Sequence, residues 1–182
     1  MMDHSENTLN AAIKSLRDTV APAVDRSDPQ AEEQLRLTID FLSFLKTRIY
    51  DIHARQRYEL ACQMQVARAL LADAASLGPD VGDRLADALS VAETTYATAG
   101  SHTDDLRAAS QQLWASVRGV VRSARTAPEE VRDRIGEQVL AGIAPLVELE
   151  SAWYVPFGFE PAPDTVPELT DLLAGSGSYE FR

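Results

Sequence analysis

A group of polar side chains interrupts the apolar pattern in the longest stretch of the chain that lacks a helix breaker. His53, Gln56 and Glu59 recur at steps of three, and Gln63 follows one turn later, so one face of a helix carries all four. An imidazole beside a carboxylate can bind a small polar ligand or transfer a proton. The pattern therefore indicates a candidate ligand-binding site, with Trp114 as a further wall.

The same residues also have a structural interpretation, as a hydrogen-bonded layer that selects how helices pair. Each buried polar group left without a partner costs about 1–3 kcal/mol, so the layer must be paired or must line a cavity. We favour the structural interpretation, because a single histidine at helical spacing is weak support for a site. Arg55, Arg57 and Asp51 are expected to point elsewhere and to form ion pairs near the surface.

Motif spacing assigns no metal, cofactor or catalytic residue to the chain. A di-iron bundle needs Glu-x-x-His pairs, and none of His4, His53 and His102 follows a glutamate by three residues. The single cysteine, Cys62, excludes a cysteine-rich zinc site and lacks a histidine one helical turn away, so we expect a buried, inert thiol. The glycine-rich loops that hold nucleotide phosphates are also absent from the sequence.

A histidine and two carboxylates occur together in the segment from His102 to Asp105. These groups could bind a metal ion, but they follow a helix break at Gly100-Ser101, where caps and acidic first turns are common. The segment therefore favours a helix cap, with Ser101 or Thr103 as the capping residue.

Apolar residues recur at steps of three and four along most of the chain, which predicts helices. The first helix is expected over residues 5–24, and Asp28-Pro29 begins a second. Gly78-Pro79 and Gly100-Ser101 then separate a third and a fourth helix. Thr126 to Glu129 has capping-box spacing and opens a fifth helix, which is expected to end near Glu150, with Pro145 ending or bending it.

Residues 29–77 contain no glycine or proline after the opening Pro29, which predicts one very long helix. Its apolar seam changes phase between Ile52 and Leu60, so we expect a kink or stutter there. Two helices with a tight break are the alternative. The predicted fold is all-α: an antiparallel bundle of about five helices over residues 1–150, followed by a C-terminal arm over residues 151–182.

The arm combines large aromatic side chains with prolines. Its four aromatic residues bring enough apolar surface that we expect all of them to be covered: Trp153, Tyr154, Phe157 and Phe159. The arm is expected to extend over its own bundle, or alternatively to bind a second copy or another protein. The short amphipathic turn over Glu168–Leu173 resembles a docking peptide.

The chain has 182 residues and a net charge of −11, which disfavours nucleic acids and membrane surfaces as partners. The low cysteine content fits a cytoplasmic protein. We therefore expect a non-catalytic interaction or scaffold protein that forms a homo-oligomer or binds another protein. The alternatives are a small-molecule-binding or enzyme-like bundle with a polar pocket near His53, Gln56 and Glu59, whose ligand is unknown, and an adaptor that docks through its C-terminal tail.

Overall fold

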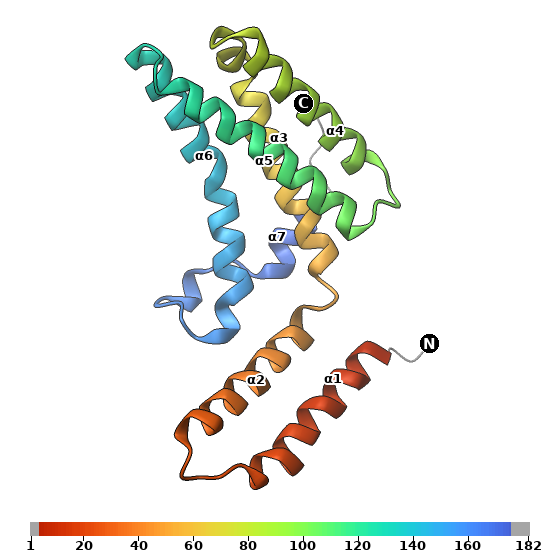
Figure 1. Ribbon diagram of the computed structural model, residues 1–182. Coiled ribbons are helices and arrows are strands. Elements are labelled where there is room, and N and C mark those ends of the chain that lie inside the picture. Colours follow the sequence, from red (N-terminus) through yellow and green to blue (C-terminus); the bar gives the residue numbers. More distant parts are fainter. Residues whose placement is uncertain (1–3, 176–182) are drawn as a thin grey trace. The chain divides into compact units, whose positions relative to one another are not determined.

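The computed structural model describes residues 4–175, and within them all regular structure is helical (Figure 1). Seven α-helices and four shorter helical turns are present in this part of the chain, without a strand. The predicted all-α class is therefore confirmed. The finer prediction of about five helices in one antiparallel bundle stays a prediction.

The chain divides into two compact units, Met1–Asp51 and Ile52–Arg182. Unit 1 is a helical hairpin. Its first helix, α1 (His4–Ser15), continues through a π-helical turn (Leu16–Val20) and a 3-10 turn (Ala21–Ala23). The second helix is α2 (Pro29–Arg48), which lies beside α1 (Figure 1, red and orange).

The start of α2 follows the sequence prediction. The Asp28 carboxylate accepts hydrogen bonds from the backbone N–H groups of Gln30 and Ala31, at 3.1 and 3.0 Å, and Pro29 occupies the first turn. These bonds satisfy two backbone donors that have no partner inside a helix.

The predicted single helix over residues 29–77 is wrong, and the alternative of two helices holds. Helix α2 ends at Arg48, and α3 (Ile52–Ser76) begins after a turn in which the Asp51 N–H donates to the Arg48 carbonyl at 2.9 Å. The break lies just before the phase change in the apolar seam. Each seam thus belongs to a separate helix, and the seam of α3 forms much of the core of unit 2.

Unit 2 is built on α3, α4 (Pro79–Ala97) and α5 (Thr103–Ala124), each of which contacts the other two. Gly78, with a φ of 135°, reverses the chain between α3 and α4 as the sequence predicts. Large apolar side chains from all three helices fill the centre of the unit, among them Leu60, Leu70, Leu85, Leu106 and Leu113.

Helix α6 (Glu129–Tyr154) packs against α3 and α5, and the short α7 (Leu169–Gly175) packs against α6 and α3. Leu169 and Leu173 of α7 are buried there. Helix α6 contains Pro145 and continues past Glu150 to Tyr154, so Trp153 and Tyr154 belong to this helix.

The predicted capping box at the start of α6 is not formed. Pro128 is the N-cap, and Thr126 Oγ1 donates to the Ser123 carbonyl at 3.3 Å instead. The Thr126 side chain thus closes the preceding turn rather than the new helix. Among residues 4–175, no helix is both long enough and apolar enough to cross a bilayer.

Candidate functional site

Arg55 is the centre of a polar cluster that joins α3 to α6. Its Nε donates to Glu59 Oε1 at 2.7 Å, and a terminal nitrogen donates to Glu150 Oε1. The guanidinium carbon lies 4.5 Å from the ring centre of Trp153 and 5.9 Å from that of Tyr154. The prediction that Arg55 points away from this layer is therefore wrong.

The protonation state of Arg55 follows from its partners. Burial lowers the pKa of the guanidinium, whereas the hydrogen bond to Glu59 and the charges of Glu59 and Glu150 raise it. The net direction is upward, so Arg55 stays protonated and acts as a fixed cation. It has no proton to exchange near neutral pH.

Of the residues predicted to form a polar layer, Gln56 and Glu59 contact each other, whereas His53 and Gln63 lie apart from them. Gln56 Nε2 donates to Glu59 Oε2 at 3.3 Å, so both oxygens of this carboxylate have partners. His53 is exposed, and its Nε2 lies 3.1 Å from the carbonyl oxygen of Ser101, in the loop between α4 and α5. The structural interpretation and the ligand-binding interpretation of these residues both stay predictions.

Gln63 and Trp114 lie elsewhere in unit 2. Gln63 is 8% exposed, and its Oε1 has no hydrogen-bond partner among the described residues. Trp114, on α5, is half-buried against the apolar core of α3, α4 and α5.

Arg57 and Cys62, which lie near the predicted polar layer in the sequence, also have structural roles. Arg57 was expected to form an ion pair near the surface, but its guanidinium lies 4.2 Å from the ring centre of Tyr96 and donates to the Tyr96 carbonyl at 3.0 Å. The contact joins α3 to the last turns of α4. Cys62 is buried as predicted, and burial raises the pKa of its thiol to about 11, which leaves little reactive thiolate near neutral pH.

His102 caps α5, as the position of this segment at a helix start indicates. Its Nδ1 accepts a hydrogen bond from the Asp104 N–H at 3.2 Å, and the Asp105 carboxylate accepts one from the His102 N–H at 3.2 Å. The histidine itself is the capping residue, rather than Ser101 or Thr103.

The four aromatic residues near the C-terminus have different surroundings. Trp153 of α6 is buried and has the guanidinium of Arg55 over its ring, whereas Phe159 is 85% exposed. The ring of Phe157 lies beside both exposed rings. Its centroid is 6.2 Å from that of Tyr154 and 6.0 Å from that of Phe159. The described residues of the same chain therefore do not cover all four rings, and covering of the exposed rings by a second copy or another protein stays a prediction. Trp153 is in the last turn of α6, whereas Phe159 follows the 3-10 turn Val155–Phe157 and Gly158, where φ is 73°.

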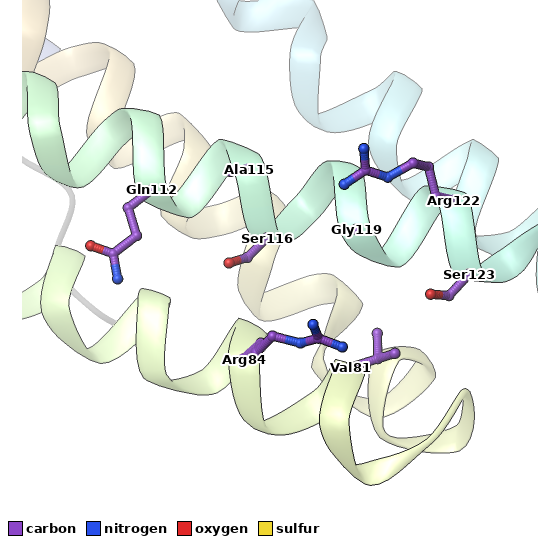
Figure 2. A pocket seen from close by; sticks show the side chains of 8 residues that line it. All are labelled: Val81, Arg84, Gln112, Ala115, Ser116, Gly119, Arg122 and Ser123. Carbon is purple, nitrogen blue, oxygen red and sulfur yellow. The ribbon is translucent and has the colours of Figure 1, made fainter.

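Sequence reasoning missed an open groove between α4 and α5 in unit 2, shown in Figure 2. It has a volume of about 420 Å³. Its lining combines two arginines, neutral polar side chains and small residues: Val81, Arg84, Gln112, Ala115, Ser116, Gly119, Arg122 and Ser123. The sequence signals this groove only through the small residues that recur at helical spacing on α5. The two arginines come from different helices, so their places in the sequence do not show that they line one groove.

Comparison with protein-family models, with curated proteins and with solved structures found no match to this chain. Its function is therefore argued from its own geometry.

Proposed function

We propose that this chain is a non-catalytic interaction protein that forms a homo-oligomer through the helical hairpin of unit 1. One observation supports the proposal above all others. Of the described residues 4–51, only Ile13 and Ile39 are buried. Most of the stability of a helix in a protein comes from packing its apolar face, so a hairpin with two buried side chains needs a further surface.

The apolar side chains available for such packing lie on α2. Leu37 is 45% exposed and Phe41 is 56% exposed, and they are one helical turn apart. Val20, at the end of the π-helical turn after α1, is also exposed. Leu37 and Phe41 thus form an exposed apolar stripe on α2.

A second copy of the hairpin suits this stripe. Two antiparallel hairpins make a four-helix bundle, and a twofold axis lets each copy present the same face to the other. The charges beside the stripe have both signs: Arg36 pairs with Glu33 at 2.6 Å and with Asp40 at 3.0 Å. A surface with paired charges can meet its own copy without like-charge repulsion.

The mass of the full-length protein in solution tests the proposal. Sedimentation equilibrium should give a mass of at least two chains for the wild type, and Leu37→Glu or Phe41→Glu should shift it towards one chain. Leu140→Glu is the matched control, because Leu140 on α6 is 68% exposed and lies outside unit 1. A single-chain wild type, or dissociation by the control alone, would reject the hairpin interface.

The exposed aromatic arm favours a second candidate function, that of an adaptor which docks on a different protein. Phe159 is exposed beside Phe157, with the ring centroids 6.0 Å apart, so the two rings can enter a groove on a partner together. Glu160, Asp164 and Glu168 follow it, so the matching partner has an apolar groove with a basic rim.

Binding to a purified partner tests the adaptor function, once affinity capture has identified one. Phe159→Ser should abolish the binding with little change in melting temperature, whereas Leu140→Ser should leave it intact. Unchanged binding by Phe159→Ser would count against the arm as the docking element.

A further inference from the structure

We propose that the groove between α4 and α5 binds the phosphate group of a small phosphate monoester. The groove lies wholly within unit 2, and every residue that lines it comes from one of these two helices (Figure 2). Its lining includes two cationic side chains and no carboxylate. That composition is unusual in a chain whose net charge is −11.

The two arginines retain free hydrogen-bonding capacity. Arg84 Nε donates to the Asp80 carbonyl at 2.6 Å, which leaves its terminal nitrogens without a partner among the described residues. Arg122 forms no ion pair within residues 4–175. By contrast, Arg68 pairs with Glu93 at 2.8 Å, and Arg134 pairs with Asp73. The groove thus presents guanidinium groups that the protein has not neutralised.

The neutral polar groups of the groove are also available. The hydroxyls of Ser116 and Ser123 and the amide of Gln112 have no hydrogen-bond partner in the described part of the chain. On the facing helix, Thr94 and Thr95 donate to carbonyls of their own helix, at 2.9 Å each. The two serines are therefore free to donate to a bound oxygen.

A phosphate group matches these donors better than a carboxylate does. It carries about 1.5–2 negative charges at neutral pH and offers three acceptor oxygens, and arginine binds it through paired hydrogen bonds. The two guanidinium groups of the lining carry enough positive charge to balance it, and the serines and Gln112 offer further hydrogen-bond donors.

The groove is also larger than a phosphate ion. Its volume of about 420 Å³ is in the range of small-molecule sites, about 300–1,000 Å³. Val81 and Ala115 supply apolar wall, and a Cβ placed on Gly119 would meet no atom within 4 Å. This space accommodates the organic part of a monoester.

Titration calorimetry of the full-length protein with phenyl phosphate and with inorganic phosphate, at constant ionic strength, tests the proposal. We expect saturable binding of both, tighter for phenyl phosphate. Arg84→Gln and Arg122→Gln should each weaken it about tenfold or more, since a hydrogen bond to a charged group is lost. Arg118→Gln is the matched control, because Arg118 is exposed on α5 but does not line the groove.

A variant that blocks the groove distinguishes phosphate binding inside the groove from nonspecific attraction to the charged surface. Gly119→Leu keeps both arginines and fills open space, so it should abolish phosphate binding without lowering the melting temperature. Amide NMR shifts on phosphate addition should concentrate at Ser116, Gly119 and Ser123. Absence of saturable binding, an equal loss in Arg118→Gln, or phenyl phosphate bound no tighter than inorganic phosphate would overturn the proposal.

Discussion

The guanidinium of Arg55 lies 4.5 Å from the centre of the Trp153 ring, so a cation on the first turns of α3 covers an aromatic ring on the last turn of α6. The same guanidinium donates to Glu59 on its own helix and to Glu150 on α6. An arginine can do all of this at once because its planar fork stacks on a ring while its edges donate hydrogen bonds. The contact therefore holds the C-terminal end of α6 against α3.

Replacement of Arg55 by lysine should destabilise unit 2 although the charge is kept. A lysine cannot stack flat on Trp153 or bond two carboxylates with one rigid group, so the free energy of unfolding should fall by about 1–2 kcal/mol in urea titrations. Arg107→Lys is the control, because Arg107 is exposed and pairs with Asp104 on the surface. Equal small losses in both variants would show that the stacked geometry contributes nothing.

Replacement by alanine should change the free energy of unfolding in opposite directions at Gly142 and Gly136 of α6. A Cβ at Gly142 would lie 2.4 Å from Cγ2 of the buried Val66, whereas one at Gly136 would meet no atom within 4 Å. Gly142→Ala should therefore lower the free energy of unfolding by about 1–3 kcal/mol through overpacking. Gly136→Ala should raise it by up to about 1 kcal/mol, because alanine favours the helix. Thermal or urea unfolding of both variants tests this prediction. A gain in stability for Gly142→Ala would contradict close packing of α6 on α3.

The ion pair between Asp73 and Arg134 should make stability depend on pH. Arg134 Nε lies 3.0 and 3.1 Å from the two carboxylate oxygens of Asp73, whose side chain is 8% exposed. The hydrogen bond to Arg134 lowers the pKa of Asp73 below its ordinary value of 3.8. A depressed folded pKa stabilises the protein above the unfolded pKa, and this contribution is lost as the pH falls through the folded pKa.

Asp73→Asn measures this contribution directly. At pH 7 the variant should be less stable than the wild type by about 1–3 kcal/mol, because a charged hydrogen-bond acceptor is lost. The difference should begin to narrow as the pH falls below about 4, the ordinary pKa of an unfolded aspartate, and should be lost only as the pH falls through the lowered pKa of folded Asp73. Urea titrations of both proteins at a series of pH values test this prediction. A stability difference between them that does not change with pH would exclude Asp73 as the source of the pH dependence.

Gln63 should be replaceable by an apolar residue of similar length. Its Oε1 is buried without a partner in the described residues, and such a group costs about 1–3 kcal/mol. Gln63→Met should therefore leave the free energy of unfolding unchanged or raise it by about 1 kcal/mol, whereas Gln65→Met, at an exposed position of the same helix, should have little effect. A clear loss of stability in Gln63→Met would mean that the amide has a partner, such as a bound water or ligand.

Several features of the fold could be predicted from the sequence because they depend on neighbours in the chain. Asp28 caps α2 through N–H groups two and three residues away, and Gly78 ends α3 because glycine tolerates positive φ. The hydrogen bond from Gln56 to Glu59 is likewise a contact one turn apart. Apolar spacing predicted the helical class for the same local reason.

The break between α2 and α3 shows where local reasoning fails. Ile49, Tyr50 and Asp51 include no glycine or proline, so no residue there forces the helix to end. The break coincides with the boundary between the two compact units, Met1–Asp51 and Ile52–Arg182. The exposure of Phe159 has a similar origin, since it depends on where the chain leaves α6 rather than on the aromatic character of the segment.

The amino-acid sequence alone was enough to predict the all-α class, the cap at Asp28, the turn at Gly78 and the burial of Cys62. The packing of the helices, which the sequence did not reveal, brings Arg55 to Glu150, 95 residues away, and places Arg84 and Arg122 along one groove. The physical reason is the range of the interactions. Caps, glycine turns and apolar spacing act within one or two helical turns, whereas contacts between helices depend on how distant faces pack together.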